Sequence, residues 1–231
     1  MSRAAAILLG RTRRRARLLA LLRRLGRDRS GLALIEFAYT LPVLLTLGLL
    51  GADVARLTVF NMQVSQVALS LADNASRLGQ TDNSGITPTV READVDAVID
   101  GALRQGAPID LQKNGRVILS SFEYDADRKL QYIHWQRCRG GLGGQSSYGN
   151  DSTRNGLTGP RITGLGQGSQ KITVGPGTAV MFVEITYRYD PLLGTPFGLG
   201  ERMLRHEGAF LIRDDRNLTP GLTGSSDRSR C

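Results

Sequence analysis

The longest apolar segment of the chain runs from Leu32 to Ala52 and contains one charged residue, Glu36. As an α-helix this segment is about 32 Å long, which matches the ~30 Å hydrocarbon core of a bilayer. The run is too long for the apolar region of a simple secretory signal peptide, and no A-x-A cleavage pattern directly follows it. The pattern therefore predicts a transmembrane helix.

Beyond Ala52, apolar positions recur every three or four residues among polar ones, which is typical of an amphipathic helix. They are Val54, Leu57, Val64, Val67, Leu71, Ala75 and Leu78. Gly79 supplies a stop signal. We therefore predict one helix over residues 32–78, with an apolar half at 32–52 and an amphipathic extension at 53–79. The extension alone is equally typical of a helix that packs on a core.

The rest of the chain predicts an exported globular domain over residues 80–216. Residues 80–90 are typical of a loop, and the apolar spacing after Glu92 predicts a short helix up to Gly106. Strand patterns occupy Arg116–Tyr124, Lys129–Gln136, Thr178–Tyr189 and Gly208–Arg213, with a Gly-rich loop at 139–171 and a flexible tail at 217–231. This order predicts an α+β fold, in which a long, partly transmembrane N-terminal helix packs on a C-terminal antiparallel β-sheet.

The basic character of the chain is confined to its start. The net charge is +9, and residues 1–30 contain ten arginines and one acid, Asp28. Subtracting these from the 30 basic and 21 acidic residues of the whole chain leaves 20 of each in residues 31–231. Basic residues that precede a membrane span hold that end in the cytoplasm. We therefore interpret residues 1–31 as a basic leader that sets topology, and its position argues against a nucleic-acid partner. Its leucines, interleaved with the arginines, fit either a helix lying on the membrane surface or a leader without fixed structure.

Glu36 is unusual because a carboxylate inside a bilayer is costly, about 2.5–3.5 kcal/mol for an acid at the centre of a span. Gly31 lies five residues before it, and Phe37 directly follows it. A cut after Gly31 makes Leu32 the new N-terminus and Glu36 the fifth residue of the shortened chain. In a bundle of such helices, the new α-ammonium of one subunit would pair with Glu36 of its neighbour and set the register. The alternative is an acid that reaches the nearby cytoplasmic surface.

The segment from Gly31 to Phe37, which opens an apolar helix after a basic leader, resembles the class III prepilin peptidase site of type IV pilins and pseudopilins. The sequence from Glu36 onward is similar, more particularly, to the TadE-like family. It reads Glu36-Phe37-Ala38-Tyr39-Thr40-Leu41-Pro42-Val43-Leu44-Leu45, with Gly48, Gly51 and Arg56 beyond. The close resemblance covers about residues 29–60. Leu32 departs from the Phe that many type IV pilins have at that position.

This resemblance implies a pilin-like minor pseudopilin of the tight-adherence (Tad/Flp) type IV pilus, which is involved in adhesion. It implies a processing site at Gly31 and Leu32, and an assembly register set by Glu36 and Phe37. The implied partners are a prepilin peptidase, the major pilin and other minor pilins, and an inner-membrane assembly platform. The implied location is the bacterial inner membrane, crossed once with the N-terminus in the cytoplasm, and the extracellular pilus after processing. The alternative is an uncleaved single-pass envelope scaffold.

The chain has two cysteines, Cys138 and Cys231, and members of the family commonly carry a cysteine pair in the exported part. Export to an oxidising compartment favours a disulfide between them. Such a bridge would tie the tail to the second predicted strand. The alternative is two independent thiols.

No motif for catalysis, cofactor binding or metal binding is evident. His134 with Cys138 lacks further nearby ligands for zinc, and Asp125 with Asp127 fits a turn better than a calcium loop. The glycines spell neither a phosphate-binding loop nor a complete dinucleotide fingerprint. We therefore expect that the chain is not an enzyme and that it binds neither a cofactor nor a metal.

Overall fold

The computed structural model describes residues 20, 23, 24, 26, 30–79, 87–169, 171–192, 200–213, 216–224 and 229–231. The chain divides into two compact units, Met1–Gly51 and Ala52–Cys231. The predicted leader, 1–31, lies outside the described residues except for a few positions. Most of the predicted loop at 80–90 also lies outside them.

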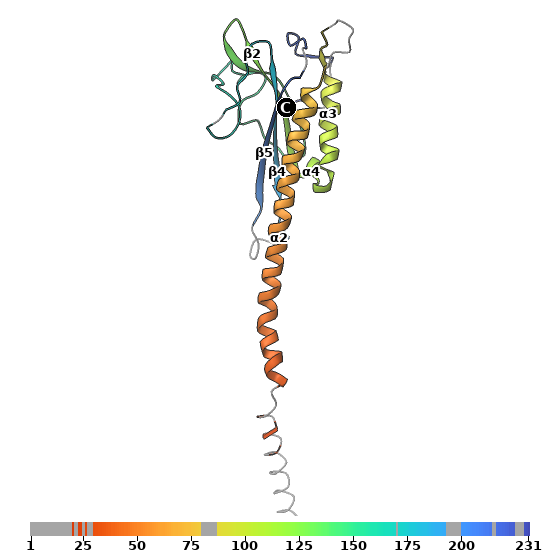
Figure 1. The fold of residues 1–231 in the computed structure, drawn as a ribbon, viewed down its shortest axis with the longest axis vertical. Helices are drawn as coiled ribbons and strands as arrows, with labels where there is room; N and C mark the ends of the chain where they lie inside the picture. Colours follow the sequence, from red (N-terminus) through yellow and green to blue (C-terminus); the bar gives the residue numbers. More distant parts are fainter. Residues whose placement is uncertain are drawn as a thin grey trace, which may run out of the picture. The chain divides into compact units, whose positions relative to one another are not determined.

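Helix α2 spans Ser30–Ser76 without interruption (Figure 1). Both of its ends lie within two residues of the predicted 32–78. Gly79, three residues past the end, takes the left-handed conformation with φ +72°. A left-handed glycine is a common way for a helix to end, because glycine has no Cβ to clash there.

The second unit contains a four-stranded antiparallel sheet in the order β3-β2-β4-β5. Its strands are β2 (Gly115–Asp125), β3 (Leu130–Arg139), β4 (Ala179–Tyr189) and β5 (Arg202–Leu211). Before them come β1 (Val90–Arg91), α3 (Glu92–Gln105), the 3-10 turn η1 (Ala107–Ile109) and α4 (Leu111–Asn114), and β6 (Leu222–Thr223) pairs in parallel with β1. The α+β prediction, with a long apolar N-terminal helix and a C-terminal antiparallel sheet, is confirmed.

Helices cover one face of the sheet. The part of α2 beyond Ala52 lies along this face beside α3 (Figure 1). Leu71 of α2 and Ile99 of α3 share one core with Leu119 of β2 and Val183 of β4, and none of the four is more than 1% exposed. The apolar face of the amphipathic extension therefore packs into the core between the helices and the sheet.

The Gly-rich loop covers the opposite face. Side chains alternate along β4, so that Phe182 points away from the helices and joins Phe122 in a second core. Leu165 and Val174, two apolar residues of the segment between β3 and β4, complete this core and are at most 5% exposed. The loop therefore forms a layer of the domain, which its composition alone did not indicate.

The loop and the tail also cover the outer edge of β3. The Ile133 amide donates to the Asn155 carbonyl at 2.8 Å, and the Cys138 amide donates to the Ser229 carbonyl at 2.6 Å. Between them, the amide of Gln136 donates to a side-chain carboxylate of the loop at 3.0 Å. An edge strand with satisfied amides does not template pairing with another chain.

Strand β5 and the C-terminal tail are among the parts that differ from the sequence expectation. Strand β5 begins at Arg202 rather than Gly208, because its first half is an exposed edge rich in charged residues and lacks the apolar pattern of a buried strand. The tail, expected to be flexible over 217–231, contributes β6 and a bridge from Arg230 to Arg137. Within it, residues 225–228 lie outside the described residues.

Candidate functional site

The first half of α2 presents an uncovered apolar surface. Every side chain from Leu32 to Leu49 is exposed, with Leu34 at 70% and Tyr39 at 75%. Soluble proteins rarely expose a contiguous apolar surface of this extent without a partner or a membrane to cover it. Among the described residues, α2 is the one helix long and apolar enough to cross a membrane.

The residues predicted for processing and register lie together at the start of this surface. Gly31, Leu32, Glu36 and Phe37 occupy the first two turns of α2, and all are exposed. A Cβ added to Gly31 would meet no other atom within 4 Å. The cut and the pairing of Glu36 with a neighbouring subunit both remain predictions.

Two threonine hydroxyls within the apolar half bond to the backbone of the helix itself. The Thr40 hydroxyl donates to the Glu36 carbonyl at 2.8 Å, and the Thr46 hydroxyl donates to the Pro42 carbonyl at 2.7 Å. Such bonds within one helix are needed where no water can serve as a partner. The helix continues through Pro42, which lacks a backbone donor.

The second unit begins with a buried acid. Asp53 is fully buried, and its Oδ1 accepts from the Tyr189 hydroxyl at 2.6 Å and from the Leu192 amide at 3.1 Å. Burial and the neighbouring carboxylate raise the pKa of Tyr189 to about 12. One turn later, the Arg56 guanidinium lies 5.6 Å from the centre of the Tyr189 ring and donates to the Asp190 carbonyl at 3.2 Å. These contacts attach the end of β4 to the helix.

From the sequence, Arg56 is named only within the resemblance to the TadE-like family, and Asp53 has no predicted role. An acid directly after an apolar run carries no signal of burial by itself. Its partner, Tyr189, lies 136 residues away in the chain, so the contact depends on the folded topology.

Cys138 and Cys231 form a disulfide, with their Cα atoms 5.0 Å apart. This pairing confirms the predicted bridge and excludes two independent thiols. Cys138 is buried on β3, and the bond holds the end of the chain against that strand beside the Ser229 carbonyl.

Ion pairs attach α3 to the edge strand β3. Arg137 makes two bonds to the Glu92 carboxylate, one of them at 2.9 Å from Nε. Arg139 lies 3.6 Å from Asp96 and 3.3 Å from Asp100. The three acids recur every four residues, so they share one face of α3. This face, mostly buried, fixes the orientation of α3.

A β-bulge on β3 places His134 beside a buried carboxylate. The pairing of β2 with β3 shifts between Ser121 and Phe122, and His134 is the extra residue. Its Nδ1 lies 2.8 Å from Glu123 Oε2, and the Ser121 hydroxyl donates to Glu123 Oε1 at 2.6 Å. The hydrogen bond to Glu123 raises the pKa of His134. The serine contacts the acid rather than the imidazole, so the three do not form a nucleophile–base pair.

A search of the described residues for three or more His, Cys, Asp or Glu side chains able to hold a metal ion finds no such group. In comparisons with known proteins, no family model, no curated protein and no solved structure matches this chain.

Proposed function

We propose that this chain is a TadE-like minor pseudopilin, required for assembly of a tight-adherence type IV pilus and processed by a prepilin peptidase after Gly31. The observation that carries this proposal is the uncovered apolar helix, which has Gly31, Leu32, Glu36 and Phe37 at its start and a folded domain after it. A subunit of this kind needs an apolar helix that first lies in the membrane and then packs against other subunits. One exposed surface serves both environments, because each is apolar.

The charge distribution supports an orientation with the N-terminus in the cytoplasm. Ten arginines precede the span, whereas residues 31–231 have no net charge. The domain would then lie outside the inner membrane, where an oxidising environment maintains the bond between Cys138 and Cys231. Removal of the leader would also remove the net positive charge of the chain.

We assign to Glu36 the role of aligning neighbouring subunits during assembly. Its carboxylate lies on the exposed surface one helical turn from Leu32. After cleavage, the α-ammonium at Leu32 of one subunit would pair with Glu36 of the next. The pair would offset the cost of placing both charges in an apolar bundle, and it would favour one stagger between neighbouring helices.

Complementation of a strain that lacks this chain tests the proposal. The wild type is expected to restore filaments, whereas Glu36→Ala is expected to lose its leader normally and to restore few or none. Tyr39→Phe is the matched control on the same exposed helix, and it should behave as the wild type. Filaments in the strain without the chain would refute a role in assembly. Normal filaments with Glu36→Ala would refute the pairing alone.

The same strains separate the proposal from the uncleaved envelope scaffold. A scaffold would support filaments while it retains residues 1–31, and Gly31 substitutions that block cleavage would leave its activity intact. A processed subunit would lose activity with the same substitutions.

A further inference from the structure

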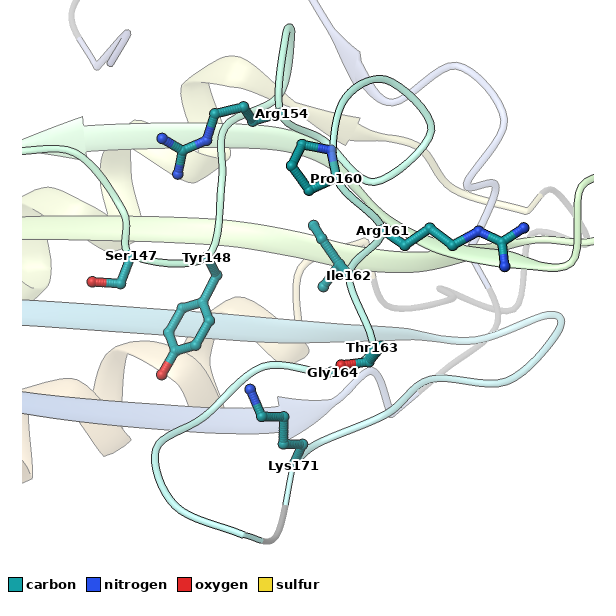
Figure 2. Close-up of a pocket in the computed structure, with 9 residues that line it drawn as sticks. All are labelled: Ser147, Tyr148, Arg154, Pro160, Arg161, Ile162, Thr163, Gly164 and Lys171. Atoms are coloured by element: carbon teal, nitrogen blue, oxygen red, sulfur yellow. The ribbon is translucent and has the colours of Figure 1, made fainter.

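The Gly-rich loop between β3 and β4 forms the layer on the face of the sheet opposite the helices, and we call it the Gly-rich layer. It contains a hollow of about 290 Å³ that the assembly proposal does not use (Figure 2). Its wall includes three basic side chains, Arg154, Arg161 and Lys171, and the hydroxyl residues Ser147 and Thr163. No acidic residue lines it. The volume lies just below the range of roughly 300–1,000 Å³ typical of small-molecule sites, so it suits a small group.

The basic residues of the Gly-rich segment are concentrated at the hollow. Between residues 140 and 178 the basic residues are Arg154, Arg161 and Lys171, and all three line the hollow. The one acid of that segment, Asp151, is engaged elsewhere, since it accepts from the Gln136 amide at 3.0 Å and lies 3.4 Å from an arginine of β3. In the part of the chain that the structure describes, none of the three cations forms an ion pair.

The backbone around the hollow is fixed by specific contacts. Asn150 Oδ1 accepts from the Arg154 amide at 2.9 Å, which holds the turn that carries Arg154. Tyr148 donates its hydroxyl to Glu207 at 2.8 Å, and its ring packs edge-on against Phe182 at 5.3 Å between centres. The site is therefore built on the sheet rather than on an isolated loop.

Gly164 permits the two loop segments that carry Thr163 and Lys171 to approach each other closely. Gly164 has φ +151°, and a Cβ at this position would lie 2.8 Å from the Cβ of Lys171. Next to it, Leu165 and Ile172 exchange backbone hydrogen bonds of 2.9 and 2.7 Å. In Figure 2 the Lys171 ammonium points toward the Tyr148 ring, whereas the guanidinium groups of Arg154 and Arg161 extend outward on opposite sides of the hollow.

We propose that this hollow binds an acidic sugar through its oxyanion, a carboxylate or a phosphate. Guanidinium groups match the planar geometry of a carboxylate and the oxygens of a phosphate, and Lys171 adds a point charge. The Thr163 hydroxyl hydrogen-bonds a neutral hydroxyl group of a sugar ring. A hollow lined by one sign of charge also attracts such a ligand from solution. This site is independent of whether the leader is cut.

Titration calorimetry on the full chain in detergent micelles tests this site. The probes are a hexuronate, a hexose phosphate and the neutral hexose. Either acidic sugar is expected to bind, with an affinity that falls as salt rises, and the better of the two identifies the source of the oxyanion. The neutral hexose is expected to bind at least tenfold more weakly. Equal binding of all three, or of none, overturns the proposal.

Two variants and a control locate the binding. Arg154→Ala and Lys171→Gln are each expected to weaken binding about tenfold, as for loss of one exposed charge-assisted hydrogen bond. Arg104→Ala removes an exposed cation from α3, which packs on the opposite face of the sheet, and it should leave binding unchanged. An equal loss in all three variants would indicate a nonspecific charge effect and refute the site. Unchanged thermal midpoints verify that the variants are folded.

Discussion

Removing the disulfide should destabilise the second unit more than any single surface substitution. The bond joins Cys138 on β3 to Cys231 at the end of the tail, and 93 positions separate them. The enclosed segment contains the Gly-rich layer, β4, β5 and β6. In the unfolded chain, the bond therefore restricts almost the whole second half of the domain.

The magnitude follows from the size of this loop. Closing a loop of this length removes unfolded-chain entropy equivalent to about 4–5 kcal/mol at room temperature. The native tail also contributes, because the Cys138 amide and the Ser229 carbonyl stay bonded only while the tail remains in place. In a domain of this size, each kcal/mol corresponds to a shift of about 2–4 °C in the unfolding midpoint. The expected loss is therefore about 8–20 °C.

Trp135 gives a selective signal for the measurement. It is the single tryptophan of the chain, and it lies in the helix-side core on β3 at 6% exposure. Urea unfolding of the full chain in detergent would be followed by its fluorescence for the oxidised wild type, the reduced wild type and the double variant Cys138→Ser/Cys231→Ser. The last two should agree and should both lose about 4–5 kcal/mol. A loss below about 1 kcal/mol would refute the loop-entropy reasoning.

Three further predictions use the same unfolding assay. Tyr189→Phe should cost about 1.5–3 kcal/mol, because it removes a buried hydrogen bond to the Asp53 carboxylate, and an unchanged midpoint would contradict the burial of that pair. His134 has a raised pKa in the folded chain, so its bond to Glu123 should stabilise the fold fully below pH ~6.5, its unfolded pKa, and less as pH rises through the folded pKa. The advantage of the wild type over His134→Gln should therefore shrink above pH ~6.5, and growth with pH would contradict this sign. Gly208→Ala should cost about 1–3 kcal/mol, since its Cβ would lie 2.6 Å from a backbone carbonyl oxygen of α2, and a neutral effect would show that β5 moves away from the helix at little cost.

The elements that the sequence predicted well are those whose signal is local. Helix α3 was expected from Glu92 to Gly106 and spans Glu92–Gln105, because apolar spacing and a terminal glycine both mark it. Strand β4 was expected within one residue, because a strand buried on both faces is a continuous apolar run. The disulfide was expected on other grounds, because the family resemblance and export to an oxidising compartment both favour a bridge between the chain's two cysteines.

The features that sequence reasoning missed depend on distant partners. Strands β1 and β6 are two residues each, too short for any periodicity, and exist because they pair with each other. The Gly-rich segment, as far as the structure describes it, contains no helix or named strand, in keeping with the expected loop. Its packing on the sheet was missed, since its few apolar residues, such as Leu165 and Val174, follow no regular spacing. The basic hollow arises only when the folded backbone brings Arg154 and Lys171 to the same hollow. None of these contacts is encoded in a short window of sequence.

The most direct test of the central claim is the N-terminal mass of the chain in a bacterial envelope that contains a prepilin peptidase. The full chain would be extracted in detergent, and its intact mass and N-terminal peptide would be determined. A chain that begins at Leu32 is the predicted result, because cleavage after Gly31 removes the basic leader and creates the α-ammonium that pairs with Glu36. A chain that still begins at Met1, or that is cut at another bond, would contradict the account.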